Sequence, residues 1–333
     1  MSGGCVSTVL VTGANGFVNL NIVRRLAQKG ARVVALARRP PDPETVRFLA
    51  AETAQVVWVE GDVRDRAGLI ELARTYGVDC IVHGAAITPS REVERAQAAT
   101  VVDVNLGGTL NALEAAREVG ARRFVLISST GVYGAPANPH RRLAEDEPLQ
   151  VSNLYTICKI AGENLSRRYD ELYEGSFVVG RLGSAYGPME RASHSRETMS
   201  MIYEFAHRAL AGDQVRIWGA ERLRDFCYIE DVAEAFARLA LADRLRWTIY
   251  NAATDRFVTV RDALETLVRL CPGFGWSEAA DREAADVAVL PSQERAPLDL
   301  SRLQEDVGFA PIHDLASGLR AYLAWLRAGW AHI

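Results

Sequence analysis

The sequence predicts an α/β protein with a doubly wound parallel Rossmann sheet and a smaller, interleaved C-terminal part. Short apolar runs alternate with helical patterns, a glycine-rich turn follows the first run, and the alternation stops after Arg181. Runs rich in Val, Ile and Leu are typical of parallel strands that helices cover on both faces. The strands expected in this half are 8–11, 32–36, 56–59, 80–82, 124–127 and 177–179.

Two helices of this first half, 102–119 and 155–172, carry apolar residues on more than one face. A helix with this pattern has an apolar face left over for a partner once one face is packed on the sheet. We therefore expect a homodimer.

The second half is predicted to interleave with the first. Helices at 198–210 and 229–241 flank a short strand at 215–218, and a strand at 248–251 is expected to rejoin the sheet. Thr259 and Asp262 form a capping pair that starts the next helix. Residues 272–297, with their Gly, Pro and acidic residues, are expected to be irregular, and 315–326 to form a closing helix.

Composition limits the classes of function. The 333 residues are 49% hydrophobic and 24% charged, as in a soluble globular protein. A formal charge of -4 argues against nucleic acid as a partner. No apolar run is long enough for a membrane span, and the start lacks a signal region, so we expect a cytoplasmic protein. Five scattered cysteines and six histidines show no metal-ligand spacing, and no metal site is predicted.

A strand running into Gly13-Ala14-Asn15-Gly16-Phe17-Val18-Asn19, followed by a helix, is typical of a dinucleotide site. Glycines let backbone amides approach a pyrophosphate, and the helix N-terminus adds positive partial charge. The residues predicted to bind the cofactor here are Gly13, Asn15, Gly16, Phe17 and Val18. Asn19 stands where a third glycine is expected, so its side chain either pushes the helix outward or makes a new polar contact.

The end of the second strand bears on the choice between NAD and NADP. An acidic residue there would bind the ribose hydroxyls of NAD, but the chain has Arg38 and Arg39 and no carboxylate. Guanidinium groups bind phosphate through charge-assisted bonds, so NADP is the preferred cofactor, with NAD as the alternative. The competing interpretation is that both arginines are merely solvated.

Tyr155 and Lys159 lie four residues apart on a predicted helix and therefore share a face. A cation beside a phenol favours the phenolate and lowers its pKa toward the range of a general base. By itself the spacing is more typical of a core edge and a solvated tip. The glycine turn and the Ser128-Ser129 pair make acid-base chemistry the better interpretation.

Together these residues resemble the extended short-chain dehydrogenase/reductase family, in its epimerase/dehydratase branch, over nearly the whole chain. The turn resembles the Gly-x-x-Gly-x-x-Gly motif of that family. The other segments that carry the resemblance are Gly61-Asp62-Val63, Val82-His83-Gly84-Ala85-Ala86, Asn105 with Gly108-Thr109, Ser128 to Gly134, Tyr186-Gly187-Pro188, and Arg224-Asp225-Phe226 through Asp231-Val232-Ala233.

The resemblance implies roles for particular residues. Tyr155 becomes the acid/base, Lys159 its activator and ribose anchor, and Ser129 the hydrogen-bond partner of the reacting oxygen. Ser129 is chosen over Ser128 because it stands three residues before Val132. Further implied cofactor contacts are Asp62, Val63, Ala85, Ala86 and Asn105, and implied substrate contacts are Thr130, Ser184 and Arg224. Residues 1–182 become the NAD(P)-binding domain, which residues about 224–255 rejoin, and 183–333 the substrate-binding part.

The expected function is reversible hydride transfer between NAD(P) and a secondary alcohol or ketone carbon of a sugar-type substrate, with a nucleotide sugar as one option. An NADP-dependent dehydrogenase or reductase of a small non-nucleotide compound is the alternative, and a catalytically silent dinucleotide-binding protein is the option from another class. Three departures from the family bear on this choice. Thr130-Gly131 replaces the Asp-Glu pair of 4,6-dehydratases, which disfavours dehydratase chemistry. Ser184 replaces the Asn usual in nucleotide-sugar enzymes, and Leu290 stands near the place of a second phosphate-binding Arg, so that Arg191 or Arg222 would have to compensate.

Overall fold

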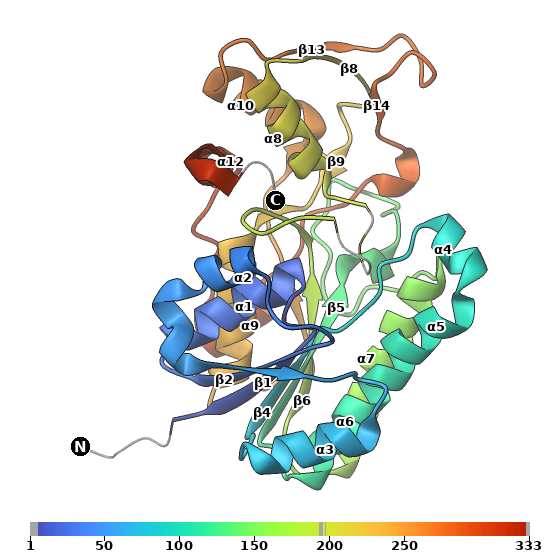
Figure 1. Ribbon diagram of the computed structural model, residues 1–333. Helices are drawn as coiled ribbons and strands as arrows, with labels where there is room; N and C mark the ends of the chain where they lie inside the picture. Colours follow the sequence, from blue (N-terminus) through green and yellow to red (C-terminus); the bar gives the residue numbers. More distant parts are fainter. Residues whose placement is uncertain (1–5, 193–195, 197, 331–333) are drawn as a thin grey trace.

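The computed structural model describes residues 6–192, 196 and 198–330. Its centre is a parallel sheet of seven strands in the order β11-β6-β5-β4-β1-β2-β3 (Figure 1), which confirms the doubly wound Rossmann fold class. The order reverses between β1 and β4, at the point where such sheets bind ligands. The strands of this sheet are β1 (Thr8–Thr12), β2 (Arg32–Ala37), β3 (Val56–Glu60), β4 (Cys80–His83), β5 (Arg123–Ser129), β6 (Phe177–Leu182) and β11 (Ile249–Ala252).

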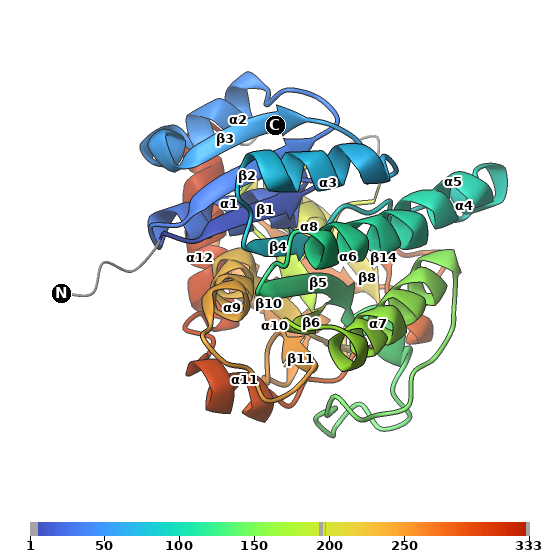
Figure 2. The same cartoon turned by 90° about the horizontal axis from the view of Figure 1, so that it is seen from below.

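Helices cover both faces of the sheet because its strands are apolar on both sides. α3 (Arg66–Thr75), α6 (Gly108–Glu118) and α7 (Leu154–Leu172) lie on one face, and α1 (Phe17–Gln28) and α9 (Ile229–Leu241) lie on the other (Figure 2). Two separate apolar clusters follow from this arrangement, one on each side of the sheet. The remaining helices of the first half are α2 (Pro43–Phe48), α4 (Arg91–Ala96) and α5 (Ala98–Val102).

The helix expected at 102–119 is not one continuous α-helix. A π-helical turn at Asp103–Gly107 joins α5 to α6, and Asn105 lies within it. Such turns carry an extra residue in the helical ladder and are frequent at functional sites. The pattern of apolar residues could not show it, because a single turn of wider helix changes the periodicity too little.

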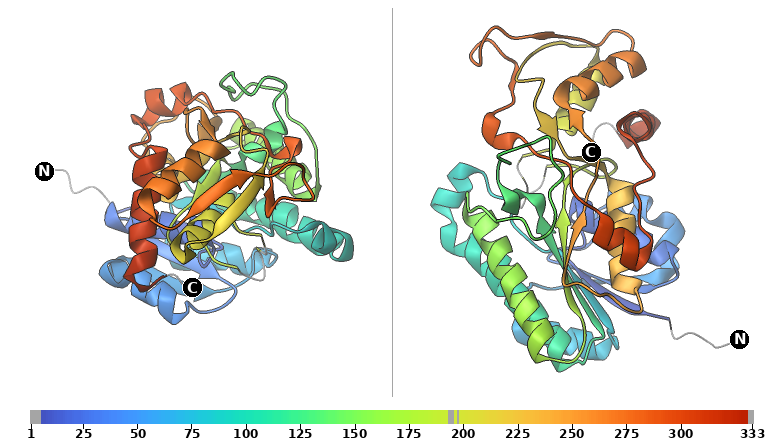
Figure 3. Two further views of the ribbon diagram at one scale, coloured as in Figure 1. Left: turned by 90° about the horizontal axis from the view of Figure 1, so that it is seen from above. Right: turned by 180° about the vertical axis from the view of Figure 1, so that it is seen from behind.

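The C-terminal half returns to the sheet before it builds a smaller layer of its own. α9 packs against α1, and β11 pairs in parallel with β6 at the edge of the sheet, as expected for 248–251. The smaller layer holds α8 (Met201–Ala211), α10 (Val260–Leu270) and α12 (Leu315–Trp325), above the sheet in Figure 1 and from two further sides in Figure 3. The capping pair of α10 is confirmed. The N–H of Thr259 donates to the carboxylate of Asp262, and the N–H of Asp262 donates to Oγ1 of Thr259.

The expectation of an irregular segment at 272–297 is partly wrong. β13 (Gly275–Glu278) and β14 (Val287–Ala288) both pair in parallel with β8 (Gln214–Trp218). These strands are short and partly exposed, so they lack the apolar run that marks a buried strand in sequence. Further short elements are β7 (Ser184–Tyr186), β9 (Leu223–Arg224), β10 (Phe226–Tyr228), β12 (Val258–Thr259) and α11 (Ser301–Val307). Within the described part of the chain, no helix has both the length and the apolar character needed to cross a membrane.

Candidate active site

A cleft of about 350 Å³ lies along the carboxyl ends of the central strands. It collects the residues that the sequence predicts for the cofactor, although they come from five separate stretches of chain. The predicted residues that line it are Gly13, Asn15, Gly16, Phe17, Val18, Arg38, Arg39, Asp62, Val63, Ala85, Ala86, Tyr155 and Lys159. The cleft therefore joins the glycine turn to the acid-base pair.

The glycine turn fits closely against the strand beside it. Gly13 has φ +69°, a conformation that L side chains rarely adopt, and a Cβ there would stand 2.8 Å from the Cα of Ala85. Helix α1 begins after Gly16, and no side chain in the described part of the chain caps it. The N–H groups of its first turn are therefore free to face an anion in the cleft.

Asn19 makes a polar contact, which decides between the two outcomes left open by the sequence. Its side chain is buried, and Nδ2 donates to the backbone oxygens of Thr12 at 3.2 Å and Gly13 at 3.0 Å. The amide thus ties the first turn of α1 to the end of β1.

His83 at the end of β4 supports the same turn. Its Nδ1 lies 2.9 Å from Oγ1 of Thr12, which also accepts from the backbone N–H groups of Gly84 and Ala85 at 3.2 Å each. Burial lowers the pKa of His83 to about 3, and the nearby Lys159 ammonium adds to the effect. The imidazole is therefore neutral, and one hydrogen bond joins it to the Thr12 hydroxyl.

Arg38 and Arg39 stand exposed at the end of β2, where the adenosine ribose of a dinucleotide binds in this fold. Asp62 is the acidic residue that lines the cleft with them, but Arg64 holds its carboxylate through Nε at 3.0 Å and Nη2 at 2.7 Å. The hydrogen bonds from Arg64 lower the pKa of Asp62. The carboxylate is thus ionised and engaged, and the two arginines remain as cations of the cleft.

Arg191 and Arg196 also line the cleft, and sequence reasoning did not assign them there. The sequence offers Arg191 as a candidate second phosphate ligand on the substrate side. Instead its Nη2 lies 2.7 Å from the carboxylate of Asp42 and 3.0 Å from Oγ1 of Thr45, beside the start of α2. A contact between residues so distant in the chain leaves no local sequence signal.

Asn105 does not line the cleft, although it was predicted to bind the cofactor. Its side chain is buried, Oδ1 accepts from the N–H of Ile87 at 2.7 Å, and Nδ2 donates to the oxygen of the same residue at 2.9 Å. Both ends of the amide are used on the backbone. Asn105 therefore supports the wall of the cleft that follows β4.

Tyr155 and Lys159 share a face of α7, as their spacing predicts, and Nζ of Lys159 lies 5.5 Å from the centre of the Tyr155 ring. Nζ donates to the backbone oxygen of Ile127 at 2.6 Å. Burial lowers the pKa of Lys159 to about 8, against the pull of the Glu163 carboxylate. Burial also raises the pKa of Tyr155, while the Ser129 hydroxyl acts in the opposite direction. The expected lowering of the Tyr155 pKa is thus absent in this structure, because desolvation of the phenolate outweighs the neighbouring groups.

The two serines at the end of β5 point to opposite sides, as neighbours on a strand do. Ser129 lies close enough to Tyr155 to act on its pKa, and its Oγ accepts from the N–H of Gly131 at 3.1 Å. Ser128 is fully buried and donates to the carboxylate of Glu163 at 2.5 Å. This placement favours Ser129 over Ser128 as a partner of the reacting oxygen.

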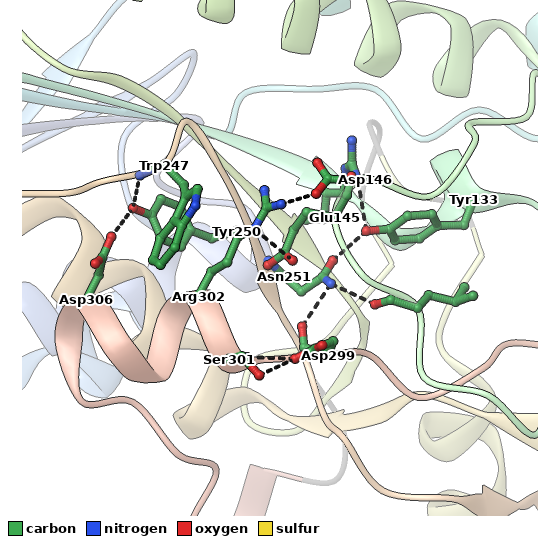
Figure 4. A network of polar contacts seen from close by, with 12 residues as sticks. Tyr133, Glu145, Asp146, Trp247, Tyr250, Asn251, Asp299, Ser301, Arg302 and Asp306 are labelled. Carbon is green, nitrogen blue, oxygen red and sulfur yellow. Dashed lines mark hydrogen bonds and ion pairs between the residues drawn. The ribbon is translucent and has the colours of Figure 1, made fainter.

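A buried polar network lies behind the active site and joins β5, β6, α7 and β11. Arg181 and Glu163 form an ion pair of 2.7 Å with both side chains 2% exposed. Nη1 of Arg181 donates to the hydroxyl of Tyr133 at 2.8 Å, which donates to Oδ1 of Asn251 at 2.7 Å (Figure 4). Glu145 accepts from the N–H of Asn251 at 2.9 Å. The rejoining strand β11 is thereby fixed to the segment that carries Ser129.

On the substrate side, the predicted residues Thr130 and Ser184 meet at one buried carboxylate. Oγ1 of Thr130 donates to Asp225 at 2.7 Å, and Oγ of Ser184 donates to the other carboxylate oxygen at 2.5 Å. Nη2 of Arg224 donates to Oγ of Ser184 at 3.2 Å. The structure thus brings the three predicted residues together, but both hydroxyl protons are used by Asp225.

The hydrogen bonds of the Arg224 guanidinium go to a backbone oxygen and a hydroxyl oxygen. Its Nη1 donates to the backbone oxygen of Gln293, and its buried Nε has no partner among the residues that the structure describes. Burial lowers the pKa of Arg224. Arg222, the other candidate for a second phosphate ligand, donates to the backbone oxygen of Val289 at 2.9 Å. The Arg224 guanidinium therefore has no carboxylate partner within the described part of the chain.

Comparisons with known proteins agree with this geometry. Residues 9–253 match the model of the NAD dependent epimerase/dehydratase family. A dTDP-4-dehydro-6-deoxy-D-allose reductase of a Streptomyces species is 30% identical to this chain, with 96% of each chain covered. The dTDP-glucose 4,6-dehydratase of Streptomyces griseus is 28% identical, with 95% of this chain and 93% of the relative covered. The crystal structure of the UDP-glucose 4-epimerase of Thermus thermophilus in complex with NAD is 27% identical, has a TM-score of 0.79, and is matched over 99% of its length by 97% of this chain.

Proposed function

The chain belongs to the NAD dependent epimerase/dehydratase family, and we propose that it moves hydride between NAD(P) and a secondary carbon of a nucleotide sugar. One observation carries this proposal: a single cleft joins the glycine turn of α1 to Tyr155 and Lys159. The relatives named above are enzymes of nucleotide sugars, which supports the substrate class.

The proposed mechanism assigns one task to each of three side chains. When bound, NAD(P) supplies the hydride acceptor or donor. Tyr155 takes the hydroxyl proton of the substrate carbon that is oxidised, and returns it in the reverse direction. Ser129 donates to the oxygen on which negative charge develops. Lys159 keeps a buried ammonium 5.5 Å from the centre of the Tyr155 ring, where it would hold the cofactor ribose and oppose the effect of burial on the phenol.

NADP is the proposed cofactor, because Arg38 and Arg39 remain as cations at the end of β2 while Asp62 is engaged by Arg64. In an Arg38→Ala/Arg39→Ala variant we expect the dissociation constant of NADPH to rise about 10- to 100-fold, as lost charge-assisted bonds imply, and that of NADH to change little. Fluorescence titration of both cofactors measures this. Arg74→Ala, on the exposed side of α3, is the control, and a wild-type preference for NADH would contradict the proposal.

The NADP preference proposed from Arg38 and Arg39 favours a net reductase. Such an enzyme consumes one NADPH at each turnover and exchanges it for another. A second candidate is a sugar epimerase that keeps its cofactor, supported by the epimerase among the similar structures. Absorbance of the purified protein, before and after gel filtration, distinguishes the two. Nicotinamide that stays bound indicates the epimerase, whereas cofactor lost on filtration and consumed in proportion to product indicates the reductase.

Dehydratase chemistry is proposed to be absent, although one relative is a 4,6-dehydratase. Thr130-Gly131 provides neither an acid nor a base, and the Thr130 hydroxyl donates to Asp225. Elimination of water requires a proton donor and an acceptor close to the reacting carbons. Formation of a 4-keto-6-deoxy product from dTDP-glucose or UDP-glucose, followed by mass spectrometry, would refute this part of the proposal.

Thr130, Ser184 and Arg224 are the proposed substrate-side residues, with Arg224 as the contact to a substrate phosphate. Because its Nη1 and Nη2 donate only to the neutral oxygens of Gln293 and Ser184, a phosphate oxygen would supply the negative charge that the guanidinium lacks among the described residues. A thermal-shift screen with NADP present, comparing nucleotide sugars with free sugars and sugar acids, tests the substrate class. Stabilisation by free sugars alone would favour the non-nucleotide alternative.

A further inference from the structure

Asn19 and Gly84 face each other beside the cofactor turn, and hydride transfer does not account for either residue. Both protons of the Asn19 amide are used, since Nδ2 donates to the oxygens of Thr12 and Gly13. The side chain is 6% exposed and lines the cleft. Asn19 therefore lies between the last residues of β1 and the space in which a dinucleotide would bind.

Gly84 provides the room for this side chain. A Cβ at position 84 would stand 2.0 Å from Oδ1 of Asn19 and 2.7 Å from its Cγ, which is an overlap of the two residues. Conversely, a glycine at position 19 would remove the donor to the Thr12 oxygen and leave Gly13 with its bond from the N–H of Gly16 at 2.8 Å. Gly84 thus leaves the space that the Asn19 side chain fills, and Asn19 supplies the donor to the Thr12 oxygen.

We propose that Asn19 and Gly84 are a matched pair that positions the dinucleotide turn for cofactor binding, which rests on the proposed function. Carbonyl oxygens repel a pyrophosphate, whereas backbone N–H groups bind it. The oxygens of Thr12 and Gly13 are directed to the Asn19 amide, while the N–H groups at the start of α1 have no side-chain cap among the described residues. Asn19 acts through the turn, so it affects NADP and NAD alike, unlike Arg38 and Arg39.

The pair is tested with Asn19→Gly, Asn19→Ala, Gly84→Ala and the double variant Asn19→Gly/Gly84→Ala. Fluorescence titration gives the dissociation constants of NADPH and NADH, and thermal unfolding gives the stability of each protein. We expect Gly84→Ala to lower the midpoint of unfolding, and the double variant to recover it, because the new methyl group enters the space that Asn19 leaves. The dissociation constants of both cofactors should nevertheless rise about 5- to 30-fold in both Asn19 single variants and in the double variant, as the loss of one or two hydrogen bonds implies.

Asn19→Ala removes the side-chain amide without adding backbone freedom, because alanine favours the helix and glycine does not. Comparison with Asn19→Gly therefore separates the two effects. Wild-type affinity in Asn19→Ala, or in the double variant, would overturn the inference and leave Asn19 with a space-filling role. A smaller effect on NADH than on NADPH would also overturn it. Failure of the wild-type protein to bind either cofactor would overturn the proposed function itself, and this inference with it.

Discussion

At the scale of single residues, burial shifts the pKa values of the two groups proposed for acid-base chemistry, Lys159 and Tyr155. Lys159 is buried, and its carbonyl partner, Ile127, carries no negative charge. The ammonium therefore loses solvation without a salt bridge to any described residue, which explains why its pKa falls to about 8. Tyr155 shifts in the opposite direction for the same reason, because burial disfavours the phenolate.

Tyr155→Phe removes the proposed acid/base and keeps the ring. We expect kcat to fall by about 10²- to 10⁴-fold or more, as for the loss of a general acid-base group, with unchanged affinity for NADPH. Steady-state kinetics and cofactor titration measure the two effects. Tyr173→Phe, at the exposed end of α7, is the matched control. Turnover close to the wild-type value would exclude Tyr155 from the chemistry.

The titration of Lys159 predicts how cofactor affinity depends on pH. As the pH rises through about 8, the ammonium is lost and with it the proposed anchor of the ribose. The dissociation constant of NADPH should therefore be flat below this pH and rise above it, by up to about 10-fold for each pH unit. Titrations between about pH 6.5 and about pH 9.5 test this. Lys159→Arg keeps its charge and should abolish the slope. An equally steep rise in that variant would assign it to another group.

At the scale of elements, the carboxyl ends of β1, β4 and β5 position the turns and side chains of the cleft. Each strand ends on a polar side chain, Thr12, His83 or Ser129, and the adjacent turns bind to these side chains. Thr12 at the end of β1 fixes the two amides after β4, and His83 at the end of β4 fixes Thr12 in return. The glycine turn is thus tied to the wall on which Ala85 lies.

His83, at the end of β4, makes the free energy of unfolding depend on pH under acidic conditions. Its pKa is about 3 in the folded protein, below the ordinary value of 6.5, so the unfolded chain takes up the proton first as the pH falls. The stability that neutral His83 provides is complete above about pH 6.5 and is lost progressively down to about pH 3, by roughly 1.4 kcal/mol for each pH unit. Urea unfolding of the wild type and of His83→Asn, between about pH 7 and about pH 4, tests this. The variant should show the shallower loss, and equal slopes would contradict the prediction.

At the scale of the whole molecule, the layer formed by α5, α6 and α7 leaves apolar side chains uncovered. Val102 is 37% exposed, Leu110 40% and Ile157 42%, and they come from helices that contact one another in Figure 1. Large exposed apolar patches mark protein–protein interaction sites. We propose that a second copy of the chain covers this face to form the homodimer.

Val102→Glu/Leu110→Glu places two charges on this face and should dissociate the dimer, because burying an unpaired carboxylate in an interface is costly. Size-exclusion chromatography with light scattering should give twice the chain mass of 36.5 kDa for the wild type and one chain mass for the variant. Val268→Glu, similarly exposed on α10, is the control that should remain dimeric. A monomeric wild type would refute the dimer.

The sequence by itself determined the alternation of strands and helices in the Rossmann half, the glycine turn, and the shared helix face of Tyr155 and Lys159, because each depends on local periodicity or spacing. Ranges such as 229–241 for α9 agree with the structure for this reason. The closeness of Tyr155 to Lys159 also follows from helix geometry alone. The roles given to Ser129, Tyr155 and Lys159 rest on the family resemblance.

Only the tertiary structure decided what distant residues do to one another. It showed that Asn19 fits because Gly84 has no side chain and that Arg191 forms an ion pair with Asp42. It also showed that Asp225 accepts hydrogen bonds from the hydroxyls of Thr130 and Ser184. It also reversed the expected pKa shift of Tyr155. Burial and contacts between distant segments arise when the chain folds, so no spacing along the sequence encodes them.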